Sequence, residues 1–374
     1  MRVVMFYHSL VSDWNHGNAH FLRGIVSEML ARGIDVDVYE PSGAWSVENL
    51  MEDHGEADIE QFHAAYPDLN SITYDLQNID LDEALDKADL VIVHEWNEPE
   101  LVARIGRHRE RNPGYCLFFH DTHHRAVTAP SELAEFDLAA YDGVLAFGDV
   151  IRDVYLEKGW ARRAWTWHEA ADTRVFYPRQ REQSQPVYEL IWIGNWGDDE
   201  RTAELSEYLI EPVHELGLRA KVYGVRYPEK ARKELKKAGI EYGGWLPNFV
   251  VPQAFAQADV TVHIPRRPYT EKLPGIPTIR PFEALACGIP LVSAYWADTE
   301  GLFSQGEDFL VARNGTEMTS QLERVLEDGT LRASLAAHGL QTVRSRHTCT
   351  KRVDELLNIY SKVEKLNMEK VMIA

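Results

Sequence analysis

The sequence has few cysteines and no long apolar run. Its three cysteines, Cys116, Cys287 and Cys349, are widely separated and odd in number. They are therefore expected to be reduced thiols, without a disulfide framework or a cysteine-based zinc site. The apolar start, residues 1–7, is too short for a signal peptide, and no run approaches the roughly 18 residues of a membrane-spanning helix. These absences predict a cytoplasmic protein with no integral membrane segment.

Positive charge is scarce in the first half of the chain. The net charge of the whole sequence is -20. Residues 1–180 carry 15 Lys and Arg against 32 Asp and Glu, a net charge of -17, so the remainder is close to neutral. Such a first half repels phosphate backbones and anionic lipid, which argues against nucleic acid and membrane surfaces as partners. The second half can still offer arginines to a diphosphate.

The length and the apolar pattern predict two domains of the α/β class. A chain of 374 residues exceeds what one hydrophobic core usually supports. Apolar runs typical of buried parallel strands alternate with helical patterns, as at residues 1–7, 89–94 and 115–119. Ligands of such sheets bind beyond the carboxyl ends of the strands, so the loops after these runs are candidate binding loops.

Two of these loops hold the candidate residues of the first half. Gly17 lies in the polar loop after the first strand. His120 and Asp121 begin a cluster that ends at His124, where a His and an Asp at a strand end can act as general base or hydroxyl ligand. A metal site and an exposed histidine-rich loop are the alternatives. Two histidines on a loop lack the helix that fixes both rings toward one ion, so no metal ligand is predicted.

The most informative stretch, residues 275–290, predicts one short helix with both ends marked. Pro281 suits the first helical position, Gly288 suits the left-handed residue past the end, and Pro290 prevents continuation. Arg280 lies at the positive end of the helix dipole, where a cation is disfavoured unless an anion shares the site. Free backbone N–H groups after Thr278 can bind that anion. The pattern therefore indicates a phosphate site.

One turn into this helix, Glu283 can accept hydrogen bonds from the paired hydroxyls of a ribose. Phosphate and ribose together indicate a nucleotide. The alternative is purely structural: Glu283 folds back onto the first N–H of its helix, and Arg280 pairs with a neighbouring carboxylate.

Further candidates follow the other predicted strands of the second half. Asn195 and Arg201 belong to a glycine-containing loop and helix start after the strand at residues 188–193, which directs N–H groups and a cation toward a diphosphate. Arg226 and Arg266 lie at later strand ends. The sequence has no dinucleotide fingerprint and no Walker A motif, so it is neither a dehydrogenase nor an ordinary NTPase.

Residues 283–290, Glu-Ala-Leu-Ala-Cys-Gly-Ile-Pro, resemble the motif of the group 1 glycosyltransferases of GT-B architecture. In that family a first Glu stands eight positions before the second, and here Gly275 occupies its place. Residues 276–283, together with 193–196 and 346–349, are most similar to the spore-maturation-protein (CgeB) branch of the superfamily.

The resemblance implies two Rossmann-like domains that face each other across a cleft. The expected boundaries are an acceptor-side domain at 1–178, a linker at 179–186, a nucleotide-sugar domain at 187–348, a helix at 349–366 and a tail at 367–374. Apolar residues at helical spacing between Val353 and Leu366 form an amphipathic face that must be buried. In the family the last helix crosses back to the first domain.

The resemblance also implies a reaction: transfer of a sugar from a UDP- or GDP-linked donor to an unknown acceptor that is soluble or bound to a protein. It implies retention of configuration and no metal ion or other cofactor, although Gly275 departs from the motif at the sugar contact. The roles it implies are diphosphate binding for Arg201 and Arg280, ribose binding for Glu283, and contact of Gly17, His120 and Asp121 with sugar or acceptor.

The nucleotide base is expected at Trp245 and Leu246, and the alternative for Trp245 is a core aromatic. Two other functions stay open. One is a nucleotide-sugar 2-epimerase, which shares the architecture, and the other is a non-catalytic nucleotide-sugar-binding protein.

Overall fold

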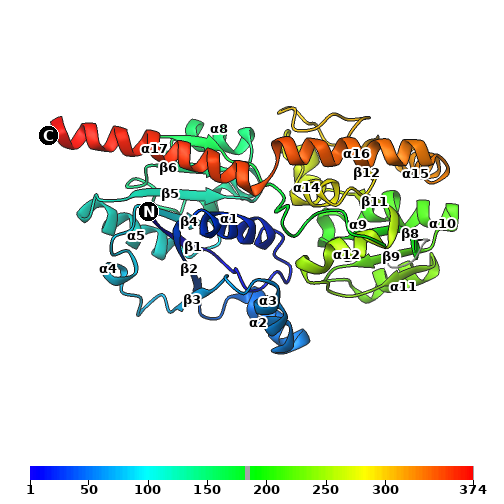
Figure 1. Ribbon diagram of the computed structural model, residues 1–374, viewed down its shortest axis with the longest axis horizontal. Coiled ribbons are helices and arrows are strands. Elements are labelled where there is room, and N and C mark those ends of the chain that lie inside the picture. The colour runs from blue at the N-terminus through cyan, green and yellow to red at the C-terminus, as the bar shows by residue number, and fades with distance from the viewer. Residues whose placement is uncertain (182–185, 374) are drawn as a thin grey trace. The chain divides into compact units, whose positions relative to one another are not determined.

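The computed structural model describes residues 1–181 and 186–373. Its contacts divide the chain into two compact units. Unit 1 comprises Met1–Glu169 and the segment that begins at Cys349, and unit 2 comprises Ala170–Thr348. Each unit is a parallel sheet covered by helices (Figure 1). The predicted α/β class, with two Rossmann-like domains, is confirmed.

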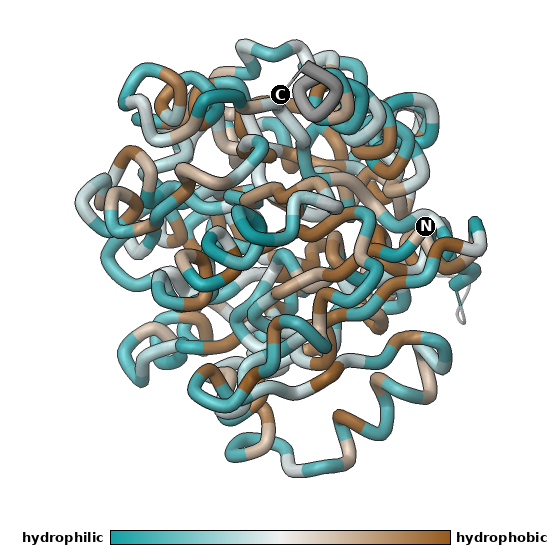
Figure 2. The backbone as a smooth tube through the Cα atoms, turned by 90° about the vertical axis from the view of Figure 1, so that its left-hand side faces the viewer, coloured by the Kyte–Doolittle hydropathy of each residue, from teal (hydrophilic) through white to brown (hydrophobic). Residues whose placement is uncertain are grey.

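Unit 1 is built on a seven-stranded parallel sheet of order β3-β2-β1-β4-β5-β6-β7. The central strands are buried along their length, as their continuous apolar runs predict. Hydrophobic residues, in brown in Figure 2, gather on inner segments, and the outer loops are mostly hydrophilic. The strands are β1 (Arg2–Phe6), β2 (Asp35–Pro41), β3 (Ser71–Tyr74), β4 (Leu90–His94), β5 (Cys116–Asp121), β6 (Gly143–Ala146) and β7 (Ala164–Thr166). The helices are α1 (Ala19–Ala31), α2 (Trp45–His54), α3 (Ala57–Ala65), α4 (Leu81–Ala84), α5 (Pro99–Arg111), α6 (Arg125–Thr128), α7 (Pro130–Leu133), α8 (Asp149–Glu157) and α17 (Cys349–Ile373).

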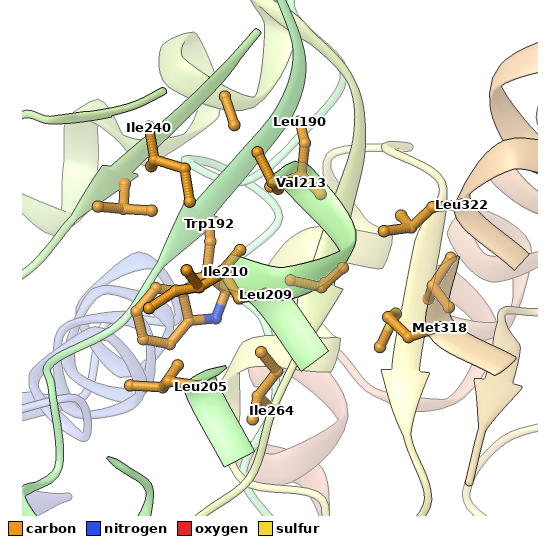
Figure 3. Close-up of a cluster of buried hydrophobic side chains, with 14 of the residues drawn as sticks. Leu190, Trp192, Leu205, Leu209, Ile210, Val213, Ile240, Ile264, Met318 and Leu322 are labelled. Atoms are coloured by element: carbon orange, nitrogen blue, oxygen red, sulfur yellow. The ribbon is translucent and has the colours of Figure 1, made fainter. Parts of the chain in front are cut away.

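Unit 2 is built on a six-stranded parallel sheet of order β10-β9-β8-β11-β12-β13. Its core packs the sheet against helices, and the labelled side chains of Figure 3, such as Trp192, Leu209 and Met318, are buried together there. The strands are β8 (Tyr188–Ile193), β9 (Ala220–Tyr223), β10 (Ile240–Tyr242), β11 (Ala258–His263), β12 (Leu291–Ala294) and β13 (Leu310–Ala312). The helices are α9 (Thr202–Leu205), α10 (Glu211–Leu216), α11 (Glu229–Lys237), α12 (Val251–Ala256), α13 (Arg267–Glu271), α14 (Ile279–Ala286), α15 (Gly315–Glu327) and α16 (Gly329–Arg346), with short turns η1 (Asp198–Glu200), η2 (Ser206–Ile210) and η3 (Asn248–Val250).

Residues 170–178, which the sequence analysis places in the first domain, belong to unit 2. The backbone N–H of Ala171 donates to the carbonyl of His347 at 3.0 Å, and the ring of Pro178 lies beside Gly288. These contacts tie the segment to the helices of unit 2. The linker predicted at 179–186 lies partly outside the described residues, because 182–185 are not described.

Helix α17 returns the end of the chain to unit 1, where it packs on α1 and β5. The indole N–H of Trp167 donates to the carbonyl of Arg352 at 2.8 Å, and Val353, Leu356 and Val363 are fully buried. The helix continues to Ile373, so the tail predicted from residue 367 is wrong. No Gly or Pro follows Leu366 to stop the helix. Among the described residues, no helix combines the length and the apolarity that crossing a membrane requires.

Truncation of a buried residue of α17 tests whether this helix is an integral part of unit 1. Leu356→Ala is expected to lower the free energy of unfolding by about 2–5 kcal/mol, because it leaves a cavity in a closed core. Leu366→Ala, on the same helix but 43% exposed, is the matched control and should change stability by no more than about 0.5 kcal/mol. Urea unfolding monitored by circular dichroism measures both, and equal effects would contradict the packing described.

Candidate functional site

The helix predicted after Thr278 is present as α14, and it begins under strain. Thr278 precedes the helix with φ 66°, a conformation that a β-branched residue rarely adopts. Such strain costs roughly 1–3 kcal/mol and is concentrated at functional sites. The helix starts at Ile279, before Pro281, which the sequence predicts as the first helical residue. Pro281 is accommodated inside the first turn, because N–H groups there have no helical partner. Gly288 has φ 65°, which confirms its predicted left-handed conformation.

Glu283 is fully buried and bound on both carboxylate oxygens. Asn248 donates its Nδ2–H to Oε1 at 2.8 Å, and Arg280 donates from Nη1 to Oε2. Arg280 therefore has the carboxylate partner that the structural alternative required. The guanidinium remains partly exposed, with 18% of its side-chain surface accessible, so a ligand can still reach it. Asn248 was not found from the sequence, because it lies in a turn with no recognisable motif.

Arg201 brings a second cation to the same place. It donates to the carbonyls of Ile264 and Asn195, and its Nε is buried without a hydrogen-bond partner among the described residues. Burial, together with the nearby charges of Arg266 and Arg280, lowers the pKa of Arg201 to about 9. Three guanidinium groups therefore gather near the start of α14. Mutually repelling cations of this kind are stabilised by an anion that binds between them.

The other two arginines that the sequence predicts to bind the nucleotide sugar are in salt bridges. Arg266 reaches Glu200 at 3.2 Å. Arg226 pairs with Asp198 at 2.7 Å, and both of these side chains are exposed. Arg226 therefore lies outside the group formed by Arg201, Arg266 and Arg280, whereas the charge of Arg266 helps to lower the pKa of Arg201.

His263, which the sequence analysis missed, connects two strands to α14. It ends β11, its Nδ1 shares a hydrogen bond with Oγ of Ser293 on β12 at 2.9 Å, and its Nε2 lies 3.4 Å from Oγ1 of Thr278. Burial and the charges of Arg201 and Arg280 lower the pKa of His263 to about 3, so the ring is neutral. The sequence could have indicated His263, because it is a polar residue at the end of the apolar strand β11.

The loops after β8 and β9 are held together by hydrogen bonds and by a close backbone contact. Oδ1 of Asn195 accepts the N–H of Val225 at 2.9 Å. A Cβ at Gly224 would lie 2.1 Å from the carbonyl oxygen of Gly194, so only glycine fits there. The predicted Asn195 therefore positions the loop and, through its carbonyl, Arg201. Trp245 and Leu246 lie half-buried in the loop after β10, at the same carboxyl edge of the sheet.

Gly275, which replaces the first Glu of the motif, is covered by another carboxylate. It has φ 95°, and a Cβ built on it would lie 2.5 Å from Oε1 of Glu300. The side chain of Glu300, from the loop after β12, therefore occupies the space that a side chain at position 275 would need. The sequence does not predict that Glu300 lies against Gly275, because the two residues are distant along the chain.

In unit 1, His120 is fully buried in β5, in register with His94 of β4. Its Nδ1 shares a hydrogen bond with the hydroxyl of Tyr7, and its ring packs against Trp167 with centroids 4.8 Å apart. Burial lowers its pKa to about 3. Its Nε2 has no hydrogen-bond partner among the described residues. His120 is therefore a neutral imidazole that is closed off from solvent.

Asp121 points to the opposite face of the sheet, because consecutive strand residues alternate. Its carboxylate accepts the hydroxyl of Tyr155 at 2.8 Å and the N–H of His123 at 2.9 Å. Buried Glu95 lies beside it, and burial together with this neighbouring carboxylate raises the pKa of Glu95. The structure therefore does not bring the side chains of His120 and Asp121 together.

The last predicted position, Gly17, is exposed in the loop before α1. Its neighbour Asn18 donates from Nδ2 to Glu169 at 3.2 Å, which fixes this loop against the end of the first segment of unit 1. Within residues 1–181 and 186–373, no group of three or more His, Cys, Asp or Glu side chains is arranged to hold a metal ion.

Comparisons with known proteins bear on the fold and the enzyme class. Residues 201–358 match a family model described as glycosyl transferase-like. None of the curated proteins matches the chain in sequence. Among solved structures, sucrose-phosphate synthase from Thermosynechococcus elongatus is similar with a TM-score of 0.67 at 14% identity, covering 98% of this chain and 100% of that one.

Two further similar structures were solved with a nucleotide. HepE from Anabaena, in complex with UDP, has a TM-score of 0.67 at 12% identity and covers 97% of this chain and 100% of that one. The T4 phage enzyme BGT, in complex with its UDP-glucose substrate, has a TM-score of 0.59 at 13% identity, and the match covers 97% of this chain and 99% of that one. The predicted GT-B fold is confirmed by these likenesses, and the predicted enzyme class, glycosyltransferase, by the family-model match together with that fold.

The buried histidine of unit 2 predicts a specific dependence of stability on pH. Because His263 has a pKa of about 3 when folded and about 6.5 when unfolded, acidification protonates it preferentially in the unfolded chain. Its contribution to stability is complete above pH 6.5 and falls by about 2 kcal/mol between pH 7 and pH 5. Urea unfolding at both values should show a smaller pH effect in His263→Gln than in the wild type.

The control for this measurement is His338→Gln, which removes an exposed histidine from α16. It should keep the pH effect of the wild type. An unchanged pH effect in His263→Gln would show that the pKa of His263 is the same in the folded and the unfolded protein.

Proposed function

We propose that the protein transfers a sugar from a UDP-linked donor to an acceptor hydroxyl. The observation that carries this proposal is the group formed by Arg201, Arg266 and Arg280 at the start of α14. In the transfer, the bond between the anomeric carbon and the diphosphate oxygen breaks, and the nucleotide leaves with the electron pair. Cations placed where this negative charge develops stabilise the transition state. UDP is preferred over GDP because similar structures were solved with UDP or UDP-glucose.

The remaining assignments follow from the same geometry. Glu283, held by Asn248 and Arg280, presents a fixed carboxylate to the ribose hydroxyls. Trp245 and Leu246 flank the base. Metal-independent transfer is favoured because arginines supply the charge, and since BGT was also solved with UDP and Mn2+, activity with and without Mn2+ tests this point. Retention of configuration and the spore-maturation-protein branch remain part of the proposal.

In unit 1, His120 is the residue proposed to contact sugar or acceptor hydroxyls, because its Nε2 has no hydrogen-bond partner among the described residues. The ring is buried, so a hydroxyl would reach Nε2 only after the surrounding side chains move. Asp121 is proposed as a positioning residue, since Tyr155 and the backbone of His123 already bind its carboxylate. One similar structure is titled a DNA-modifying β-glucosyltransferase. A DNA acceptor is disfavoured here by the net charge of -17 over residues 1–180.

Two alternatives predict the same nucleotide site. A 2-epimerase would convert the donor without any acceptor, and a binding protein would hold the donor without turnover. Product analysis with and without added acceptor separates the three functions.

A titration with UDP tests the arginine group directly. Arg280→Ala and Arg201→Ala are each expected to weaken binding at least tenfold, about 1.4 kcal/mol or more, because each removes a cation from the diphosphate. The matched control is Arg219→Ala. Arg219 precedes β9 at the amino end of the sheet and pairs with Glu189, so its loss should leave the affinity unchanged. Isothermal titration without metal measures all four proteins, and equal affinities would refute the proposed site.

Glu300 is proposed to supply the carboxylate that the motif carries at position 275. Glu300→Gln is then expected to lower kcat/KM for the sugar donor at least tenfold and to change the affinity for UDP less than twofold, since UDP lacks the sugar. Glu307→Gln, exposed in the same loop, is the control and should behave as the wild type. Unchanged kinetics in Glu300→Gln would remove Glu300 from the donor site.

A further inference from the structure

A second concave site lies wholly within unit 1. A cavity of about 590 Å³ opens beside β2 and β3, between these strands and helices α2 and α3. Its volume falls in the range of about 300–1,000 Å³ that is typical of small-molecule sites. Part of its lining, residues 40–44, lies at the carboxyl end of β2, and open α/β sheets bind ligands at such strand ends. None of the residues discussed above as site residues lines it.

The cavity has a rigid polar floor. Glu40, the penultimate residue of β2, is buried, and its Oε1 accepts the N–H groups of Leu10 and Val11 at 2.7 and 3.2 Å. These bonds hold the loop after β1 in place. Burial raises the pKa of Glu40. The floor is therefore preorganised by the fold before any ligand arrives.

The walls combine apolar and hydrogen-bonding groups. Val47 and Met51 of α2 provide apolar surface, and Ser71 and Thr73 of β3 provide hydroxyls. At the exposed rim, Glu48 extends over Gly43, with its Oε1 3.1 Å from where a Cβ on that glycine would lie. No Lys or Arg is among the lining residues, all of which belong to the described part of unit 1.

This chemistry selects one class of ligand. A phosphate or carboxylate would meet the carboxylates of Glu40 and Glu48, and His63 is the one basic side chain among the described residues of the lining, so anionic ligands are disfavoured. Carboxylate and hydroxyl oxygens suit a ligand with several hydroxyl donors, and the apolar wall suits the C–H face of a sugar ring. The arginine group of unit 2 has the opposite character and suits a diphosphate.

Side-chain contacts connect the wall of the cavity to the histidines of the same sheet. Trp45 begins α2, which lines the cavity, and stacks on His8 with ring centroids 4.4 Å apart. His8 follows β1, and the adjacent Tyr7 shares a hydrogen bond with His120. The helix beside the cavity is therefore packed against the strand end that holds His120, the proposed hydroxyl-contacting residue.

We propose that this cavity binds the acceptor and that the acceptor is a neutral sugar. The assignment of the ligand as acceptor rests on the proposed function, whereas the binding of a neutral sugar does not. The proposal therefore predicts ligand binding in unit 1 that is independent of the arginine group in unit 2.

Saturation-transfer NMR on the full chain tests this with two probes, methyl glucoside as the neutral sugar and glucose 6-phosphate as its anionic counterpart. Methyl glucoside should bind the wild type, and glucose 6-phosphate should bind at least tenfold more weakly. Ser42→Trp places a large side chain at the exposed part of the lining and should abolish the methyl glucoside signal. UDP binding, measured on the same sample, should be unchanged.

Charge reversal at the rim supplies a second variant. Glu48→Lys should raise the affinity for glucose 6-phosphate at least fivefold, whereas Glu52→Lys, the same change on α2 outside the lining, should not. If methyl glucoside does not bind, if Ser42→Trp does not affect it, or if the phosphate binds the wild type equally well, the neutral-sugar site is refuted. Loss of UDP binding in the wild type would instead refute the proposed function and leave the sugar-binding result standing.

Discussion

The ion pair between Arg280 and Glu283 is the constraint on which the candidate site of unit 2 depends. A fully buried carboxylate is stable only when a cation and hydrogen-bond donors satisfy it. Arg280 and Asn248 do so here, from the first turn of α14 and from η3. The hydrogen bond from Asn248 therefore fixes α14 against the turn before α12, and the ion pair holds Arg280 where its exposed part can meet an anion.

The rest of unit 2 keeps like charges close to this pair. Arg201 is held by two carbonyls and lies near Arg266 and Arg280, which disfavours its charged form. The close contact between the loops after β8 and β9 fixes the backbone beside Asn195, whose carbonyl accepts a hydrogen bond from Arg201. An anion bound near these arginines would offset their mutual repulsion.

Unit 1 has the complementary chemistry. His94 and His120 are neutral, because burial disfavours the protonated ring and lowers the pKa of both. The cavity of unit 1 carries carboxylates and hydroxyls, and no Lys or Arg is among the described residues that line it. The uneven charge of the sequence therefore corresponds to two kinds of surface: a group of arginines in unit 2, whose charge suits an anion, and a cavity lined by carboxylates and hydroxyls in unit 1.

The sequence by itself determined the parallel sheets, the short helix near Arg280 and the family resemblance, because these depend on local periodicity, helix ends and contiguous motifs. Only the tertiary structure decided which side chains meet. For Arg280 and Glu283 the sequence left two interpretations open, a nucleotide site or a local ion pair, and the structure shows the ion pair. No local pattern in the sequence predicts that Glu300 lies against Gly275. His120 and Asp121 are adjacent in the chain yet face opposite sides of a strand. Contacts between distant segments depend on packing and strand register, which local patterns do not encode.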